Sequence, residues 1–255
     1  MSFEINPNAD IDERIRASIS SLKELIIIFT GLTITASFAF YINSHLRVLD
    51  KNHSSSTLIL NSTIIEDSFI LLLLILCVMR FYHGNIMILD RYYIIPKQNL
   101  NHGREITLDS TAILAMTFGL AFLGLLIQHY AWFFFVYVLI TATSVLWGAR
   151  VNWANFARVL RKSEDAGVPD MLKDEFMTQM NWFMVNSLFL ILTVFFSVVA
   201  VMSTESVVLT TSENSWEINV HLDSTMFWIL SSLVFINSVW DLWVNRKEYF
   251  PRKIP

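Results

Sequence analysis

The chain contains little charge, few helix-breaking residues and almost no cysteine. Charged residues make up 16% of its 255 residues, whereas soluble domains carry about 25%. Hydrophobic residues make up 54%, and the mean hydropathy is +0.50. This composition excludes an ordinary soluble globular domain and favours an integral membrane protein. Because Cys77 is the only cysteine, neither an intrachain disulfide nor a cysteine-based metal site is possible.

The sequence also lacks a basic surface and any familiar catalytic motif. The net charge of -4 argues against nucleic acid as a partner. Serine-hydrolase, zinc-protease, phosphate-loop and dinucleotide-binding motifs are all absent. No second histidine lies within ligand spacing of His83, so we expect no metal and no cofactor. We therefore expect that the protein is not an enzyme. Acid–base chemistry inside the membrane by Arg80, His83 and Asp90 is the alternative.

Long apolar stretches define the predicted fold. A helix needs about 20 apolar residues to cross a bilayer, and the forty-residue run 110–149 contains no charged side chain. Two spans fit this run, with a break at Gln128, His129 and Tyr130. We predict an all-α integral membrane protein, a six-transmembrane helical bundle made of three helical hairpins. The predicted spans are residues 25–42, 68–89, 110–128, 131–149, 181–202 and 225–241.

Basic residues predict the orientation of this bundle. With six spans and a cytosolic N-terminus, 16 of the 18 lysines and arginines lie on the cytosolic side, and only Arg47 and Lys51 lie outside. This asymmetry follows the positive-inside rule, so both termini are predicted to be cytoplasmic. Four acidic residues among the first thirteen argue against a cleavable signal peptide. The compact, tail-free chain favours a bacterial inner membrane, with a eukaryotic membrane as the alternative.

The segments between the spans have recognisable patterns. Residues 1–24 carry a capping box at Asp10 and Glu13 and are predicted to form a cytosolic amphipathic segment, unless they simply start the first span early. Residues 206–222 alternate around a polar turn, which predicts a small β-hairpin cap outside the membrane. Residues 150–180 are predicted to form a cytosolic helical hairpin, and residues 249–255 a cytosolic tail.

The cytosolic hairpin offers a candidate surface for docking a cytosolic protein partner. Its apolar and basic side chains lie at helical spacing. The alternative is a solvated extension without a partner. The candidate docking residues are Trp153, Phe156, Arg158, Arg161 and Phe176.

Polar side chains gather in the cytosolic half of the predicted spans. Arg80 lies twelve residues into the second span, about 18 Å deep, and an ionisable group at that depth needs a partner or water. Asp241 is the natural counter-charge, with Asp90 as a nearby competitor. Hydrogen bonding between helices and snorkelling of Arg80 are the alternatives. The candidate residues of a polar vestibule or ion pair are Arg80, His83, Asp90, Asn181, Asn186, Asn237, Asp241 and Asn245.

Two functional hypotheses follow. The first is an oligomeric, channel-like protein with this vestibule on the cytosolic side and an apolar outer half. The second is a membrane-embedded sensor or scaffold that recruits a cytosolic partner, for example in a bacterial stress or defence system. A solute carrier is disfavoured because no proline interrupts a span. The expected partners are the lipid bilayer, further copies of the chain and a cytosolic protein. An Arg80 side chain on a shared central axis would favour the pore, whereas pairing with Asp241 within one subunit would favour the scaffold.

Overall fold

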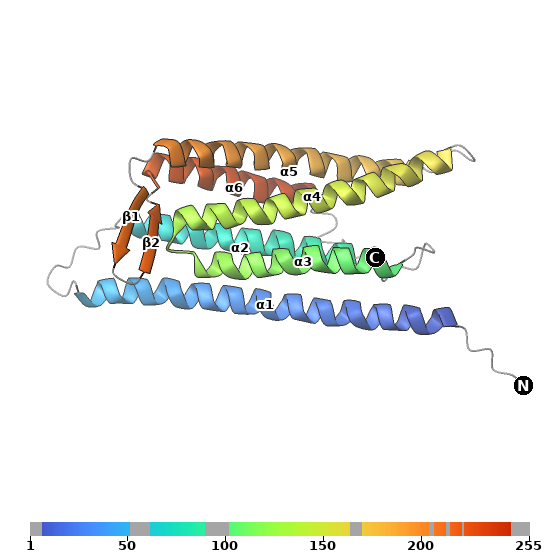
Figure 1. Cartoon of the computed structure of the whole chain (residues 1–255), viewed down its shortest axis with the longest axis horizontal. Helices are drawn as coiled ribbons and strands as arrows, with labels where there is room; N and C mark the ends of the chain where they lie inside the picture. The colour runs from blue at the N-terminus through green and yellow to red at the C-terminus, as the bar shows by residue number, and fades with distance from the viewer. Residues whose placement is uncertain are drawn as a thin grey trace, which may run out of the picture.

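A computed structural model describes residues 7–51, 62–89, 102–163, 170–203, 207–212, 215–220 and 222–245 of the chain. The described residues form six helices and one pair of strands (Figure 1). In chain order the elements are α1 (Pro7–Lys51), α2 (Ser62–Leu89), α3 (His102–Leu125), α4 (Tyr130–Ser163), α5 (Asp170–Ser203), β1 (Val207–Ser212), β2 (Ser215–Val220) and α6 (Ser224–Val244).

Five of these helices contain a segment that is long and apolar enough to cross a membrane, so the chain is a multi-pass helical membrane protein. Helix α2 is not among the five, which leaves the count one short of the six predicted spans. It nevertheless runs alongside the others through the bundle (Figure 1), and Ile70, Leu73 and Leu74 on it are fully buried. The candidate spans are Glu13–Asn43, Ile106–Leu125, Tyr130–Arg150, Met180–Met202 and Ser224–Val244.

The first helix is longer than predicted. Residues 7–24 do not form a separate interfacial helix, because they continue without a break into the first candidate span as part of α1. No glycine or proline interrupts the sequence between Pro7 and Gly31, so nothing in the local chemistry ends the helix there. The described part of this segment and the first candidate span thus form one helix, and a cytosolic amphipathic role for residues 1–24 stays a prediction.

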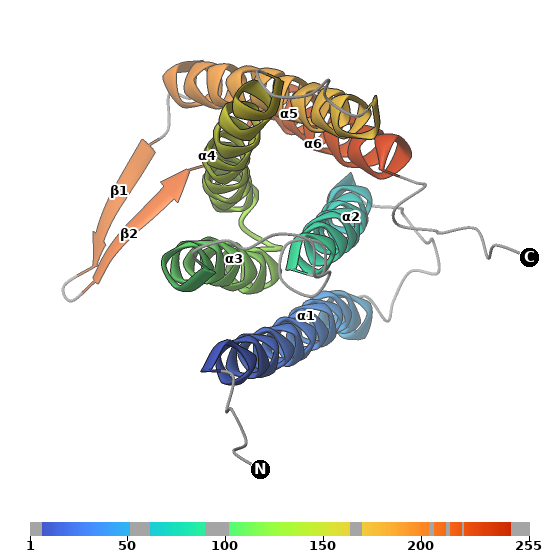
Figure 2. The ribbon, with the colours of Figure 1, turned by 90° about the vertical axis from the view of Figure 1, so that its right-hand side faces the viewer.

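Five helices pack into a closed ring. Helix α2 packs against α3 and α6, α3 against α4, α4 against α5, and α5 against α6. Helix α1 lies outside this ring, against α2 and α3, as the end-on view shows (Figure 2). Side chains on the inner faces of α2, α4, α5 and α6 are therefore directed toward a common interior, which is where the candidate site lies.

Glycine allows close approach at two contacts in the ring. A Cβ atom at Gly119 would lie 2.5 Å from the Ile140 side chain, and one at Gly148 would lie 2.8 Å from the ring of Trp182. Each glycine is the second small residue of a small-xxx-small pair in the sequence, the pattern that lets membrane helices pack tightly. The contact at Gly148 matters most, because Trp182 belongs to the site described below.

Between α5 and α6 the chain forms a two-stranded antiparallel hairpin. Val207 pairs with Val220 at one end and Ser212 with Ser215 at the turn. The predicted cap is not supported, because the hairpin projects to one side of the bundle instead of covering its end (Figure 2). Alternation in the sequence reports which residues share a face of a strand, and it carries no information on where the hairpin docks.

Candidate functional site

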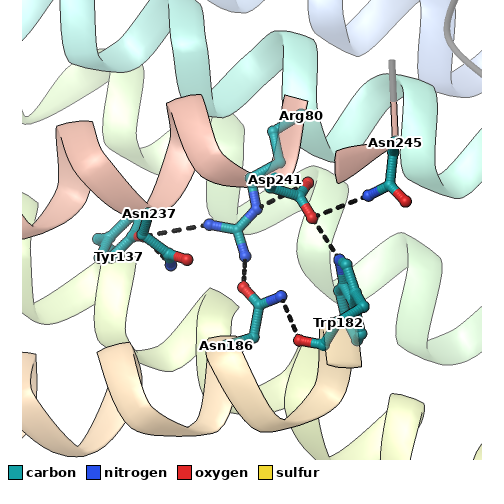
Figure 3. A network of polar contacts seen from close by, with 7 residues as sticks. All are labelled: Arg80, Tyr137, Trp182, Asn186, Asn237, Asp241 and Asn245. Carbon is teal, nitrogen blue, oxygen red and sulfur yellow. Dashed lines mark hydrogen bonds and ion pairs between the residues drawn. The ribbon is translucent and has the colours of Figure 1, made fainter. Parts of the chain in front are cut away.

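The centre of the candidate site is a buried ion pair between two helices of the ring. Nε of Arg80 on α2 lies 3.3 Å from Oδ2 of Asp241 on α6, and the two side chains are 2% and 3% exposed. Figure 3 shows the pair among the residues that surround it. An isolated charge is costly inside a membrane bundle, and pairing removes most of that cost.

The rest of the Arg80 guanidinium reaches two further helices. Nη1 donates a hydrogen bond to the hydroxyl of Tyr137 on α4, at 3.2 Å, and Nη2 donates to Oδ1 of Asn186 on α5 (Figure 3). Arg80 therefore joins α2, α4, α5 and α6 through one side chain. The planar, five-donor geometry of the guanidinium suits such a junction, which the single point charge of a lysine could not reproduce.

The Asp241 carboxylate also has hydrogen-bond donors around both of its oxygens. Its Oδ1 accepts hydrogen bonds from the indole Nε1 of Trp182 and from Nδ2 of Asn245, the latter at 3.1 Å. The carboxylate thus accepts from three donors on α2, α5 and α6, as Figure 3 shows. Full satisfaction of both charges is what makes a buried pair of this kind tolerable.

Two amides complete the cluster, which we call the Arg80 network (Arg80, Tyr137, Trp182, Asn186, Asn237, Asp241 and Asn245). Nδ2 of Asn186 donates to the backbone carbonyl of Trp182 at 2.8 Å, one turn earlier on α5. Nδ2 of Asn237 donates to the Tyr137 hydroxyl at 3.0 Å. All four helices of the network are thereby held in register by polar contacts.

Helical spacing explains why α6 and its C-cap residue Asn245 supply three members. Asn237, Asp241 and Asn245 follow one another at intervals of four residues, so they lie along one face of the helix. That face is buried against α2 and α5. The remaining members come from one position on α2, one on α4 and one turn of α5.

Five of the eight predicted vestibule residues meet in this network: Arg80, Asn186, Asn237, Asp241 and Asn245. Asn181 does not join them, because its side chain is exposed at the start of the candidate span Met180–Met202. His83 is half-buried, with its ring 5.4 Å from that of Tyr82. Asp90 lies outside the described residues. Arg80 points into its own chain, and its partner is Asp241 within the same subunit.

The predicted docking residues are described only in part. Trp153 on α4 is 74% exposed. Phe156, Arg158 and Arg161 lie on α4 and Phe176 lies on α5, but their side chains lie outside the described residues.

Sequence reasoning missed Tyr137 and Trp182, and it missed a second polar cluster. Asp109 on α3 accepts hydrogen bonds from Nε1 of Trp147 at 2.9 Å and from Nη1 of Arg150 at 2.5 Å, both on α4. We call these three residues the Asp109 clasp. A signal was present in the sequence: Asp109 and Arg150 flank the uncharged run 110–149 at equal distances from its central turn. The two arms of an antiparallel hairpin bring such positions together.

Aromatic side chains gather at the opposite end of the ring. The Tyr130 and Phe227 rings lie 4.8 Å apart, and the Phe134 and Phe227 rings lie 6.2 Å apart. The Tyr130 hydroxyl donates to Asp67 at the start of α2. The ring interior is therefore polar around Arg80 and mostly apolar toward the end that carries Tyr130.

Within the part of the chain that the structure describes, no group of three or more His, Cys, Asp and Glu side chains could hold a metal ion. The charges of Arg80 and Asp241 cancel, so the network carries no net charge for an ionic ligand. No protein family model, curated protein or solved structure matches the chain.

Proposed function

We propose that this membrane protein is a scaffold or sensor that crosses a bacterial inner membrane six times and binds a cytosolic protein through the ends of α4 and α5. One observation carries this proposal: the buried Arg80 side chain is paired with Asp241 inside its own chain. A pore between subunits would need polar groups on a shared axis, and the most prominent candidate for that role is turned inward.

The sixth crossing is assigned to α2. Its 28 residues extend about 42 Å, enough to span a bilayer core of about 30 Å. The helix has three neighbours, α1, α3 and α6, that each contain a candidate span. Its mid-span charge is compensated by Asp241, which removes the main objection to placing α2 in the membrane. Six crossings and the 16-to-2 division of basic residues together support the proposal that both termini are cytosolic.

The proposed partner surface is an arm formed by the ends of α4 and α5 that extend past their apolar spans. Helix α4 continues from Arg150 to Ser163, about 20 Å further, and α5 begins at Asp170, about 15 Å before its span starts at Met180. Both ends lie on the same side of the bundle (Figure 1). Trp153 is exposed on this arm, and exposed tryptophans are frequent anchors of protein interfaces.

Photocrosslinking in native membranes tests the arm. A benzophenone amino acid at Trp153 should give a discrete crosslink to a cytosolic protein, which is lost when residues 158–176 are replaced by a short flexible linker. The matched control is Leu146, which is equally exposed but lies within the candidate span and should crosslink to lipid alone. Identical crosslinks at both positions, or a complex unaffected by the replacement, would contradict the proposal.

Reporter fusions test the topology independently. Green fluorescent protein should be fluorescent at either terminus, and alkaline phosphatase should be inactive at both, because phosphatase folds only outside the cytosol. Reporters that place the two termini on opposite sides of the membrane would exclude an even number of crossings. That result would remove α2, or another helix, from the membrane.

A channel-like function is the second candidate, and the polarity of the ring interior favours it. The Arg80 network lies toward one end of the ring, and the Tyr130, Phe134 and Phe227 aromatic cluster lies toward the other. An aromatic constriction of this kind could open by wetting. Liposome flux with the wild-type protein and with Arg80→Gln tests this candidate; no flux in any ionic condition, with correct insertion, would count against it. That several copies of the chain associate, as a pore between subunits would require, also stays a prediction.

A further inference from the structure

The antiparallel register of β1 and β2 gives the hairpin one apolar face. Paired residues of an antiparallel ladder share a face, and successive residues of a strand alternate between faces. Leu209 pairs with Ile218 on one face, and the next pair, Thr210 with Glu217, lies on the other. The opposite face is polar apart from Val208. The positions on the apolar face are Val207, Leu209, Thr211, Trp216, Ile218 and Val220.

The hairpin stands largely clear of the helices that the structure describes. Its two strands pair with each other, and neither packs extensively against a helix. In the side view the hairpin runs crosswise to the helices at one end of the bundle (Figure 1). The end-on view shows that it projects outward beside α4, away from the ring (Figure 2). An isolated two-stranded hairpin is marginally stable in water, so the apolar face requires another surface against which to pack.

Both ends of the hairpin are held near the level at which the candidate spans end. The span in α5 ends at Met202, five residues before β1 begins, and the span in α6 starts at Ser224, four residues after β2 ends. A fully extended chain advances at most about 3.6 Å per residue, so the strands begin and end within about 18 Å and 14 Å of the two spans. Because the hairpin runs crosswise, the rest of its length stays at a similar level.

The helices beside the hairpin present apolar side chains to lipid at the same end of the bundle. Met202 at the end of α5 is 82% exposed, and Val198 one turn earlier is also exposed. Trp132 and Phe135 on the first turns of α4 are exposed as well. Exposed apolar side chains on the spans of a membrane protein contact lipid tails of the same polarity. The hairpin extends sideways from this lipid-contacting surface, past the edge of the bundle (Figure 2).

We propose that the hairpin is a membrane-surface anchor, whose apolar face enters the boundary between the headgroups and the acyl chains of the adjoining lipid leaflet. Trp216 lies beside the turn, and tryptophan is enriched at this boundary. Glu217 is the only charged residue in the two strands, so the attraction is hydrophobic and needs no anionic lipid. The inference holds for either orientation of the bundle, and it is independent of the partner surface on the arm.

Spin labels on the full-length protein in phosphatidylcholine nanodiscs test the anchor. The background is Cys77→Ala, which removes the one native thiol. A nitroxide is attached to Ile218→Cys on the apolar face or to Glu217→Cys, the adjacent residue on the polar face. At position 218, collisions with oxygen, which dissolves in lipid, should exceed collisions with a water-soluble nickel chelate several-fold. At position 217 that ratio should be reversed, and equal ratios at the two positions would overturn the proposal.

A second pair of variants and a change of lipid complete the test. Leu209→Cys and Thr210→Cys repeat the comparison on β1, so the result does not depend on the folding of one variant. If the apolar-face labels are protected from both reagents, protein covers that face, for example a second copy of the chain, and the lipid anchor is refuted. Addition of anionic phosphatidylglycerol should leave all four ratios unchanged. An apolar-face signal that appears only with anionic lipid would contradict a hydrophobic anchor.

Discussion

The Arg80–Asp241 pair makes a quantitative prediction about stability. Asp241→Asn preserves the shape of the side chain and a carbonyl oxygen for Trp182, but it removes the negative charge that faces Arg80. The guanidinium is left buried with a neutral neighbour. Loss of one partner from a buried ion pair is strongly destabilising, because the remaining charge has been moved out of water without compensation.

The magnitude follows from the geometry. Two unit charges 3.3 Å apart attract each other by about 5 kcal/mol at an effective dielectric constant of about 20. Breaking a buried pair by removing one member costs about 3–5 kcal/mol in soluble proteins. We therefore expect Asp241→Asn to lower the free energy of unfolding by about 3–5 kcal/mol. Replacing both members by apolar residues, Arg80→Met with Asp241→Leu, should recover about 2–3 kcal/mol relative to the sum of the single changes.

Equilibrium unfolding in mixed micelles of dodecyl maltoside and increasing SDS, followed by tryptophan fluorescence, measures these differences. Asp223→Asn is the matched control, because it makes the same change on the same helix at an exposed N-cap. Asparagine caps a helix about as well as aspartate, so this variant should be nearly neutral. The two variants thus separate the effect of the ion pair from that of losing a carboxylate on α6.

Two results would refute the reasoning. The first is a loss below about 1 kcal/mol in Asp241→Asn, the value typical of exposed pairs. The second is a double variant whose loss equals the sum of the single losses, which would show that the two charges are not coupled. Either outcome would mean that Arg80 has another source of compensation, such as water that reaches it from the cytosol.

Two further predictions concern the packing around this pair. Gly148→Ala should destabilise the protein by about 1–3 kcal/mol, because the added Cβ would lie 2.8 Å from the Trp182 ring and displace the indole from Asp241. The same unfolding assay measures this loss. Trp147→Phe keeps a buried ring but removes the Nε1 donor to Asp109, and should cost about 1.5 kcal/mol as a hydrogen bond to a charged group.

Matched controls exist for both predictions. A Cβ at Gly84 would meet nothing within 4 Å, so Gly84→Ala should be neutral or slightly stabilising through helix propensity. If Gly148→Ala behaves like Gly84→Ala, α4 and α5 do not pack as described. Trp153→Phe changes an exposed indole and should lie within about 0.5 kcal/mol of wild type. A Trp147→Phe variant as stable as Trp153→Phe would exclude a contribution from the Asp109 clasp.

Much of the candidate site was accessible from the sequence because charges inside apolar stretches are rare. Arg80 and Asp241 stood out as a pair for this reason, and the four-residue spacing of Asn237, Asp241 and Asn245 placed three members on one helical face. Tyr137 and Trp182 did not stand out, because aromatic residues are common in every span and their polar atoms show no distinctive spacing.

The limits of the secondary-structure prediction have similar causes. The end of the amphipathic segment at residue 24 was placed where the charged residues stop, although a helix continues through such a change unless a glycine, proline or cap ends it. The strand pattern of 206–222 carried pairing information but no docking information, so its placement over the bundle was not supported.

By itself, the sequence determined that the chain is a helical membrane protein and which polar residues share a helical face, because both follow from local hydrophobicity and a 3.6-residue period. Only the tertiary structure decided which helices are neighbours, that five of them close into a ring, and that Arg80 meets Asp241 within one chain. Lipid tails and apolar side chains are alike in polarity, so hydropathy cannot tell a face that contacts lipid from one that contacts another helix. Close packing and the pairing of buried polar groups make that distinction, and both depend on residues far apart in the chain.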